Sequence, residues 1–66
     1  MTVKEFQALD SADQCAILDN CKDPLTAESL SLRRCRFSWT AVSVHLGGID
    51  SPDGCRMRCA RYLKRI

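Results

Sequence analysis

The chain has 66 residues, 45% of them hydrophobic, and its ten Lys and Arg residues outnumber eight Asp and Glu residues for a net charge of +2. This length gives one small domain, residues 1 to 66, and argues against an enzyme, while the hydrophobic content excludes intrinsic disorder. No apolar run reaches the ~20 residues that a membrane-spanning helix needs, and residues 1 to 10 lack the apolar segment of a signal peptide. We therefore expect no membrane association, and an intracellular protein of the cytoplasm, nucleoid or nucleus with reduced cysteines.

Capping signals at regular intervals predict an all-α fold, a small bundle of four to five short helices. No segment alternates apolar and polar residues for long enough to indicate a strand. The segments from Thr2 to Glu5 and from Ser11 to Gln14 both fit the capping box, in which a Ser or Thr oxygen and an acidic or amide side chain satisfy two backbone N–H groups. They predict helices over residues 3 to 9 and 12 to 21.

Three further helices follow in the second part of the chain. Asp23 before Pro24 is a cap followed by proline, which predicts a helix over residues 24 to 35 with Leu25, Leu32 and Ser29 facing inward. Ser38 predicts a helix over residues 39 to 46, ended by two glycines and with one inward face: Trp39, Val42, Ser43 and Leu46. Ser51 before Pro52 predicts a last helix that runs to the C-terminus.

The last helix separates apolar from basic residues. At 3.6 residues per turn, one arc forms the expected core face: Cys55, Cys59, Tyr62, Leu63 and Ile66. The opposite arc carries cations and one thioether, with Arg56 at the border of the core face: Met57, Arg58, Arg61, Lys64 and Arg65. No acid follows Asp53, so the basic residues lack acidic partners four positions along the helix.

The mild net charge hides a strong asymmetry along the sequence. Residues 1 to 31 hold two lysines and six acids, a net charge of −4, whereas residues 32 to 66 hold eight cations and two acids, a net charge of +6. Seven of these eight cations are arginines, which form forked hydrogen bonds to phosphates and base edges. Residues 1 to 23 are thus predicted as acidic N-terminal helices, and residues 24 to 66 as a helix-turn-helix core with a basic C-terminal recognition helix.

Residues 39 to 63 resemble the second half of a Myb/SANT-type helix-turn-helix DNA-binding repeat. The matching residues are Trp39, Val42, Ser43, Leu46, Gly48, Ser51, Cys55, Arg56, Arg58 and Leu63. The resemblance implies that Arg56, Met57 and Arg58 lie near DNA, because in that family the Cys-Arg-x-Arg segment belongs to the helix in the major groove. The chain departs from the family pattern in a longer turn and in Cys59, which stands where the family usually has an aromatic residue.

Charge and resemblance together predict a small protein that binds double-stranded DNA and regulates transcription or recombination. The predicted nucleic-acid-binding residues are Arg33, Arg34, Arg36, Arg56, Met57, Arg58, Arg61, Lys64 and Arg65. The alternative is a protein-interaction module, a small inhibitor or adaptor, that docks its basic helix on an acidic protein surface. The acidic N-terminal helices are expected to bind a second copy of the chain or a protein partner.

The five cysteines are interpreted as structural, with no metal or other cofactor. The sequence contains no CxxC pair, and its single histidine, His45, has no partner at ligand spacing. Cys55 and Cys59 lie in the apolar arc, where cysteine acts as a small hydrophobic residue. We predict no catalytic residues, because a nucleophilic cysteine needs an adjacent base.

Overall fold

The computed structural model describes all residues from 1 to 66 and contains five α-helices and no strand, which confirms the all-α prediction. The observed bounds lie within two residues of the predicted ones. The helices are α1 (Val3–Ala8), α2 (Ser11–Asp19), α3 (Pro24–Arg34), α4 (Trp39–His45) and α5 (Pro52–Lys64).

Side-chain caps start the helices where the sequence predicts them, with one exception. Thr2, Asp23, Ser38 and Ser51 each accept a hydrogen bond from a backbone N–H of the first turn, and Thr2 forms a complete capping box with Glu5. These contacts satisfy donors that a helix start otherwise leaves unpaired. The α1, α3, α4 and α5 start sites are therefore encoded locally.

The start of α2 differs from the prediction. Asp10, rather than Ser11, caps the helix and accepts a hydrogen bond of 2.9 Å from the Asp13 N–H. The predicted capping box at Ser11 was wrong, because the Gln14 side chain is buried and points back to α1. Its Nε2 donates to the Phe6 carbonyl at 3.0 Å, so Gln14 joins the two N-terminal helices.

Two helix ends share one backbone geometry. After α4, Gly47 and Gly48 have φ values of 76° and 72°, and their N–H groups donate to the Val44 and Ser43 carbonyls. After α3, Arg36 has a φ of 68°, and the N–H groups of Arg36 and Phe37 bond back in the same way. Both are Schellman motifs, in which a residue with a left-handed backbone conformation ends the helix.

The core consists of two small clusters that follow one another along the buried side of α5. One contains Phe6, Leu30, Cys59 and Leu63, the other contains Leu32, Val42 and Cys55, and the Trp39 ring packs against both. The predicted burial of Cys55, Cys59 and Leu63 is confirmed. Ile66 is 57% exposed, contrary to prediction, because α5 ends at Lys64.

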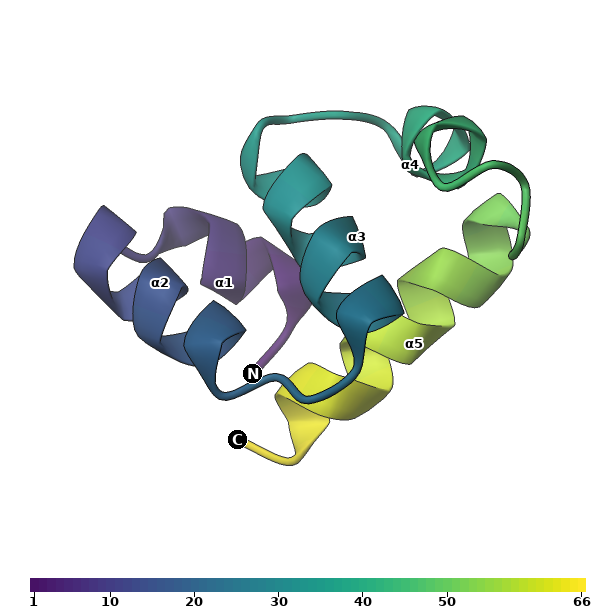
Figure 1. The fold of residues 1–66 in the computed structure, drawn as a ribbon. Helices are drawn as coiled ribbons and strands as arrows, with labels where there is room; N and C mark the ends of the chain where they lie inside the picture. The colour runs from purple at the N-terminus through teal and green to yellow at the C-terminus, as the bar shows by residue number, and fades with distance from the viewer.

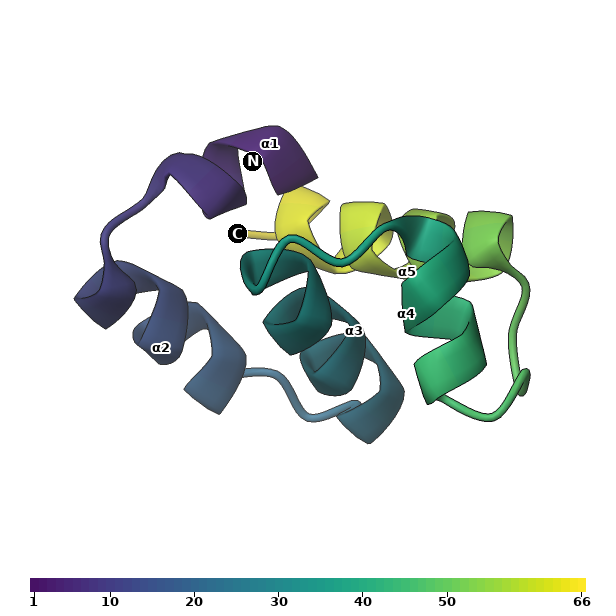
Figure 2. The ribbon, with the colours of Figure 1, turned by 90° about the horizontal axis from the view of Figure 1, so that it is seen from above.

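The arrangement leaves one side of α5 in solvent. Helices α1, α3 and α4 all pack against α5, whereas α2 packs on α3 at the edge of the molecule farthest from α4 (Figure 1 and Figure 2). Figure 2 shows α1 beside the C-terminal half of α5. The acidic α2 is thus kept away from the exposed face of α5.

Candidate nucleic-acid interface

The exposed face of α5 carries two parallel rows of side chains. One row contains Met57, Arg61 and Arg65, and the other contains Arg56, Ala60 and Lys64, and all six are exposed. The spacing of four residues places each row along one side of the helix, opposite the buried Cys59. The structure thus exposes five of the six predicted α5 interface residues: Arg56, Met57, Arg61, Lys64 and Arg65.

Arg56 is not at the border of the core, as predicted, but is exposed and ion-paired. Its Nη2 lies 2.8 Å from the Asp53 Oδ1, and its Nε donates to the same oxygen at 3.1 Å. Asp53 lies one turn before Arg56, so the basic face of α5 does have one acidic partner. Exposed pairs of this kind hold a side chain weakly, and phosphate can compete for it.

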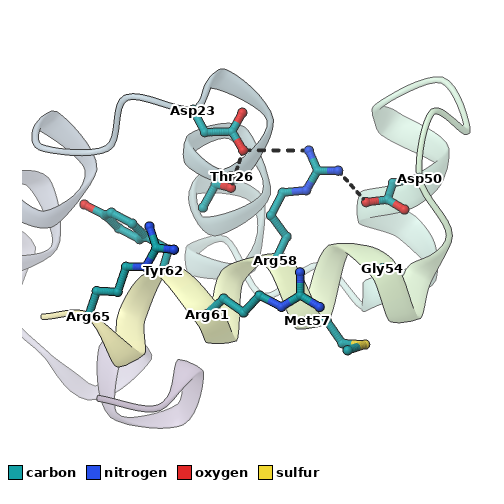
Figure 3. Close-up of a pocket in the computed structure, with 9 residues that line it drawn as sticks. All are labelled: Asp23, Thr26, Asp50, Gly54, Met57, Arg58, Arg61, Tyr62 and Arg65. Carbon is teal, nitrogen blue, oxygen red and sulfur yellow. Dashed lines mark hydrogen bonds and ion pairs between the residues drawn. The ribbon is translucent and has the colours of Figure 1, made fainter.

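Arg58, the sixth predicted residue, points sideways into an ion-pair network. Its Nη2 lies 2.8 Å from the Asp50 Oδ2 and its Nη1 lies 3.8 Å from the Asp23 Oδ2, which also accepts a hydrogen bond from the Thr26 hydroxyl (Figure 3). Only 33% of the Arg58 side chain is exposed. Arg58 therefore joins the loop before α5 to the start of α3.

Gly54 makes room for this network. A Cβ at Gly54 would overlap the Asp50 carboxylate, which lies over the first turn of α5. The same carboxylate accepts a hydrogen bond of 3.0 Å from the Ser51 N–H, and the Asp50 carbonyl accepts one from the Ser43 hydroxyl. The contacts of Asp50 thus hold the loop between α4 and α5 against both helices.

A shallow cavity of about 420 Å³ lies beside the first row. Figure 3 shows Arg58, Arg61 and Arg65 projecting from α5 along this side, with Asp23 at the start of α3 and Asp50 beside the first turn of α5. Both acids are engaged by Arg58. Arg61 and Arg65 form no ion pair within the molecule, so their charges are available to a ligand.

The predicted cations at the end of α3 are not gathered at this cavity. Arg33 donates to the Phe37 carbonyl at 2.8 Å and lies 4.6 Å above the Trp39 ring, a cation–π contact. Arg34 donates to the Ser11 hydroxyl at 2.6 Å and thereby ties α3 to α2. Arg36 is exposed without a partner, and its left-handed backbone was not foreseen.

A second, larger groove of about 670 Å³ lies on the other side of α5, against α1. Lys4 lines it together with Arg33, Arg56 and Lys64. Sequence reasoning missed Lys4, because this residue belongs to the acidic half of the chain and only the packing of α1 on α5 brings it to the basic half.

The cysteines are all free, and no group of three or more His, Cys, Asp or Glu side chains comes together to hold a metal ion. Burial raises the pKa of the Cys59 thiol to about 12, with a smaller contribution from the neighbouring Cys55. A thiol of this pKa is protonated and inert at neutral pH, as expected of a packing residue. Burial also raises the pKa of Tyr62, whose hydroxyl donates to the Ile17 carbonyl at 2.7 Å.

None of the five helices has the length and apolar character that crossing a bilayer requires. No protein-family model, curated protein or solved structure matches this chain. The resemblance of residues 39 to 63 to Myb/SANT-type repeats therefore stays a prediction.

Proposed function

We propose that this protein binds double-stranded DNA with α5 in the major groove, as an intracellular regulator of transcription or recombination. In this proposal α4, the glycine turn and α5 form the helix-turn-helix. Met57, Arg61 and Lys64 face the base edges, and Arg56 and Arg65 contact phosphates on either side.

The observation that carries the proposal is the pair of exposed rows on α5. The 13 residues of this helix span ~20 Å, and the major groove, about 12 Å wide, admits one helix. A helix with cations on both flanks meets the phosphates of both strands at once. Arg61, Lys64 and Arg65 have no acidic partner to displace, which favours binding to a polyanion.

The contacts of the remaining predicted residues assign them a different part in the proposal. Arg33, Arg34 and Arg58 are held by intramolecular bonds and support the positions of α3 and α5. Arg36 is free to contact the DNA backbone. The direct contribution to binding is therefore expected from α5 far more than from the end of α3.

The test is fluorescence anisotropy with a random-sequence duplex over a range of salt concentrations. If Arg56 and Arg65 neutralise about two phosphates, log K falls with log salt at a slope of roughly −1.8, and Arg65→Ala lowers this to roughly −0.9. Lys22→Ala is the matched control, since Lys22 is exposed next to Asp23, outside the α5 face. Its slope should equal that of the wild type.

A wild-type protein that does not bind the duplex at low salt contradicts the proposal. That result would favour the protein-interaction module, in which the same basic face docks on an acidic protein surface. A salt-independent affinity would exclude the phosphate contacts on which the proposal depends.

A further inference from the structure

The groove between α1 and α5 differs in chemistry from the rest of the basic surface. Its rim carries Lys4, Arg33, Arg56 and Lys64, and none of the residues that line it is acidic. The cavity on the other side of α5 contains Asp23 and Asp50. The α1/α5 groove thus carries four cations and no acid, unlike the cavity on the other side of α5.

Two of the four cations are held by contacts within the molecule and two have no such contact. Arg33 is stacked on Trp39 and bonded to the Phe37 carbonyl, and Arg56 is bonded to Asp53. Lys4 and Lys64 are exposed and form no ion pair or hydrogen bond through their side chains. The Nε of Arg33 is buried without a hydrogen-bond partner, an unusual state for an arginine beside an open groove.

The floor of the groove is apolar. Val3 and the Trp39 ring are half-buried, and Ala60 is the small residue of the α5 row that faces the groove. A phosphate backbone would satisfy the cations but would leave this floor uncovered. A peptide that carries carboxylates as well as an apolar side chain would neutralise the cations of the rim and also cover the apolar floor.

We propose that the α1/α5 groove binds an acidic segment of a partner protein, with an aliphatic or aromatic side chain against Val3 and Trp39 and carboxylates at Lys4 and Lys64. This site is separate from the Met57, Arg61 and Arg65 row, and it does not depend on DNA binding. Because Lys64 belongs both to this groove and to the proposed DNA interface, the acidic segment and the duplex would compete for the protein.

The probe is a short synthetic peptide of Asp and Glu with two leucines, and its control has serine in place of each leucine. Trp39 is the only tryptophan of the chain, so its intrinsic fluorescence reports occupation of the groove. We expect the leucine peptide to change the Trp39 emission and to bind about tenfold or more tightly than the serine peptide, since only leucine buries apolar surface. Equal affinity for both peptides would overturn the apolar part of the site.

The variants Lys4→Glu and Ala60→Glu place negative charge in the groove. Both fit the fold, because an acid is favourable in the first turn of α1 and residue 60 is exposed. Each should weaken the leucine peptide by about tenfold or more, whereas Arg61→Glu, a matched charge reversal outside the groove, should leave it nearly unchanged at physiological salt.

The same variants separate this proposal from DNA binding. Arg61→Glu should abolish duplex binding and keep peptide binding. Lys4→Glu should weaken peptide binding and keep duplex binding. Two results together would overturn the proposal: the wild-type protein does not bind the peptide, and Lys4→Glu loses duplex binding. They would show that the groove binds phosphate. Wild-type binding of the peptide but not of the duplex would leave the α1/α5 site standing and refute the DNA proposal alone.

Discussion

At the scale of single residues, the arginines of α5 differ in their contacts: Arg58 forms ion pairs within the molecule, and Arg61 and Arg65 do not. Arg61 and Arg65 extend into solvent, whereas Arg58 reaches Asp50 and Asp23. Pattern alone places these three arginines on the same face, since they lie three or four positions apart. Arg58 differs because two acids lie within reach of its guanidinium group: Asp50 in the loop before α5 and Asp23 at the start of α3.

Replacing Arg58 by glutamine should lower the free energy of unfolding by about 1 kcal/mol, because a partly exposed charge-assisted hydrogen bond contributes roughly that amount. Arg61→Gln is the control and should change it by less than about 0.5 kcal/mol, as expected for a surface substitution. Urea unfolding followed by circular dichroism measures both. Equal stabilities of the two variants would show that the Asp50 pair contributes nothing to the fold.

At the scale of the helices, α3 and α4 end in the same motif with different residues at the left-handed position. Gly47 occupies it after α4, where glycine adopts a positive φ without strain, and Arg36 occupies it after α3. An L-residue in this conformation costs about 1 to 2 kcal/mol. The end of α3 therefore stores strain that the end of α4 avoids.

Opposite substitutions at these two positions should have opposite effects. Arg36→Gly should raise the free energy of unfolding by about 0.5 to 1 kcal/mol after the entropy of glycine in the unfolded chain is counted, and Gly47→Ala should lower it by about 1 kcal/mol. No atom lies within 4 Å of a Cβ at Gly47, so the loss would come from the backbone and not from a clash. The midpoints of urea unfolding at constant slope test this, and a stabilising Gly47→Ala would refute it.

The helices were predictable because their signals are local. Ser38 and Ser51 cap the N–H groups three residues ahead of them, so a short stretch of sequence suffices. The burial of Gln14 and Leu30 was not predictable in the same way, because it depends on how α1, α3 and α5 pack. The same holds for the interface: exposure of Arg61 and Lys64 follows from helical periodicity, whereas the ion pairs of Arg58 and the presence of Lys4 depend on contacts between distant segments.

At the scale of the whole molecule, the buried thiol of Cys59 makes the free energy of unfolding depend on pH in the alkaline range. The pKa of Cys59 is about 12 in the folded protein and 9.0 ordinarily, so the unfolded chain loses this proton first. The stabilisation is complete below about pH 9 and is lost as the pH rises to about 12. Tyr62, whose pKa is also raised, acts in the same direction above its ordinary value of 10.0.

We therefore expect the free energy of unfolding to fall steadily above about pH 9, as linkage requires for groups that are protonated more strongly in the folded state. Cys59→Ala should lower the stability at neutral pH through the cavity it creates, but flatten the alkaline decline. Cys35→Ala, at an exposed cysteine, should keep the wild-type decline. A decline of the same steepness in Cys59→Ala would show that other groups cause it.

The position of Trp39 has a consequence for cooperativity. Its ring is the one side chain that packs against both core clusters, and the stacked Arg33 covers it. A domain of this size buries a small fraction of its surface, so neither cluster of three or four residues has much stability of its own. Because both clusters share one ring, disorder in either removes the wall of the other, and the two halves of the molecule must unfold in a single step.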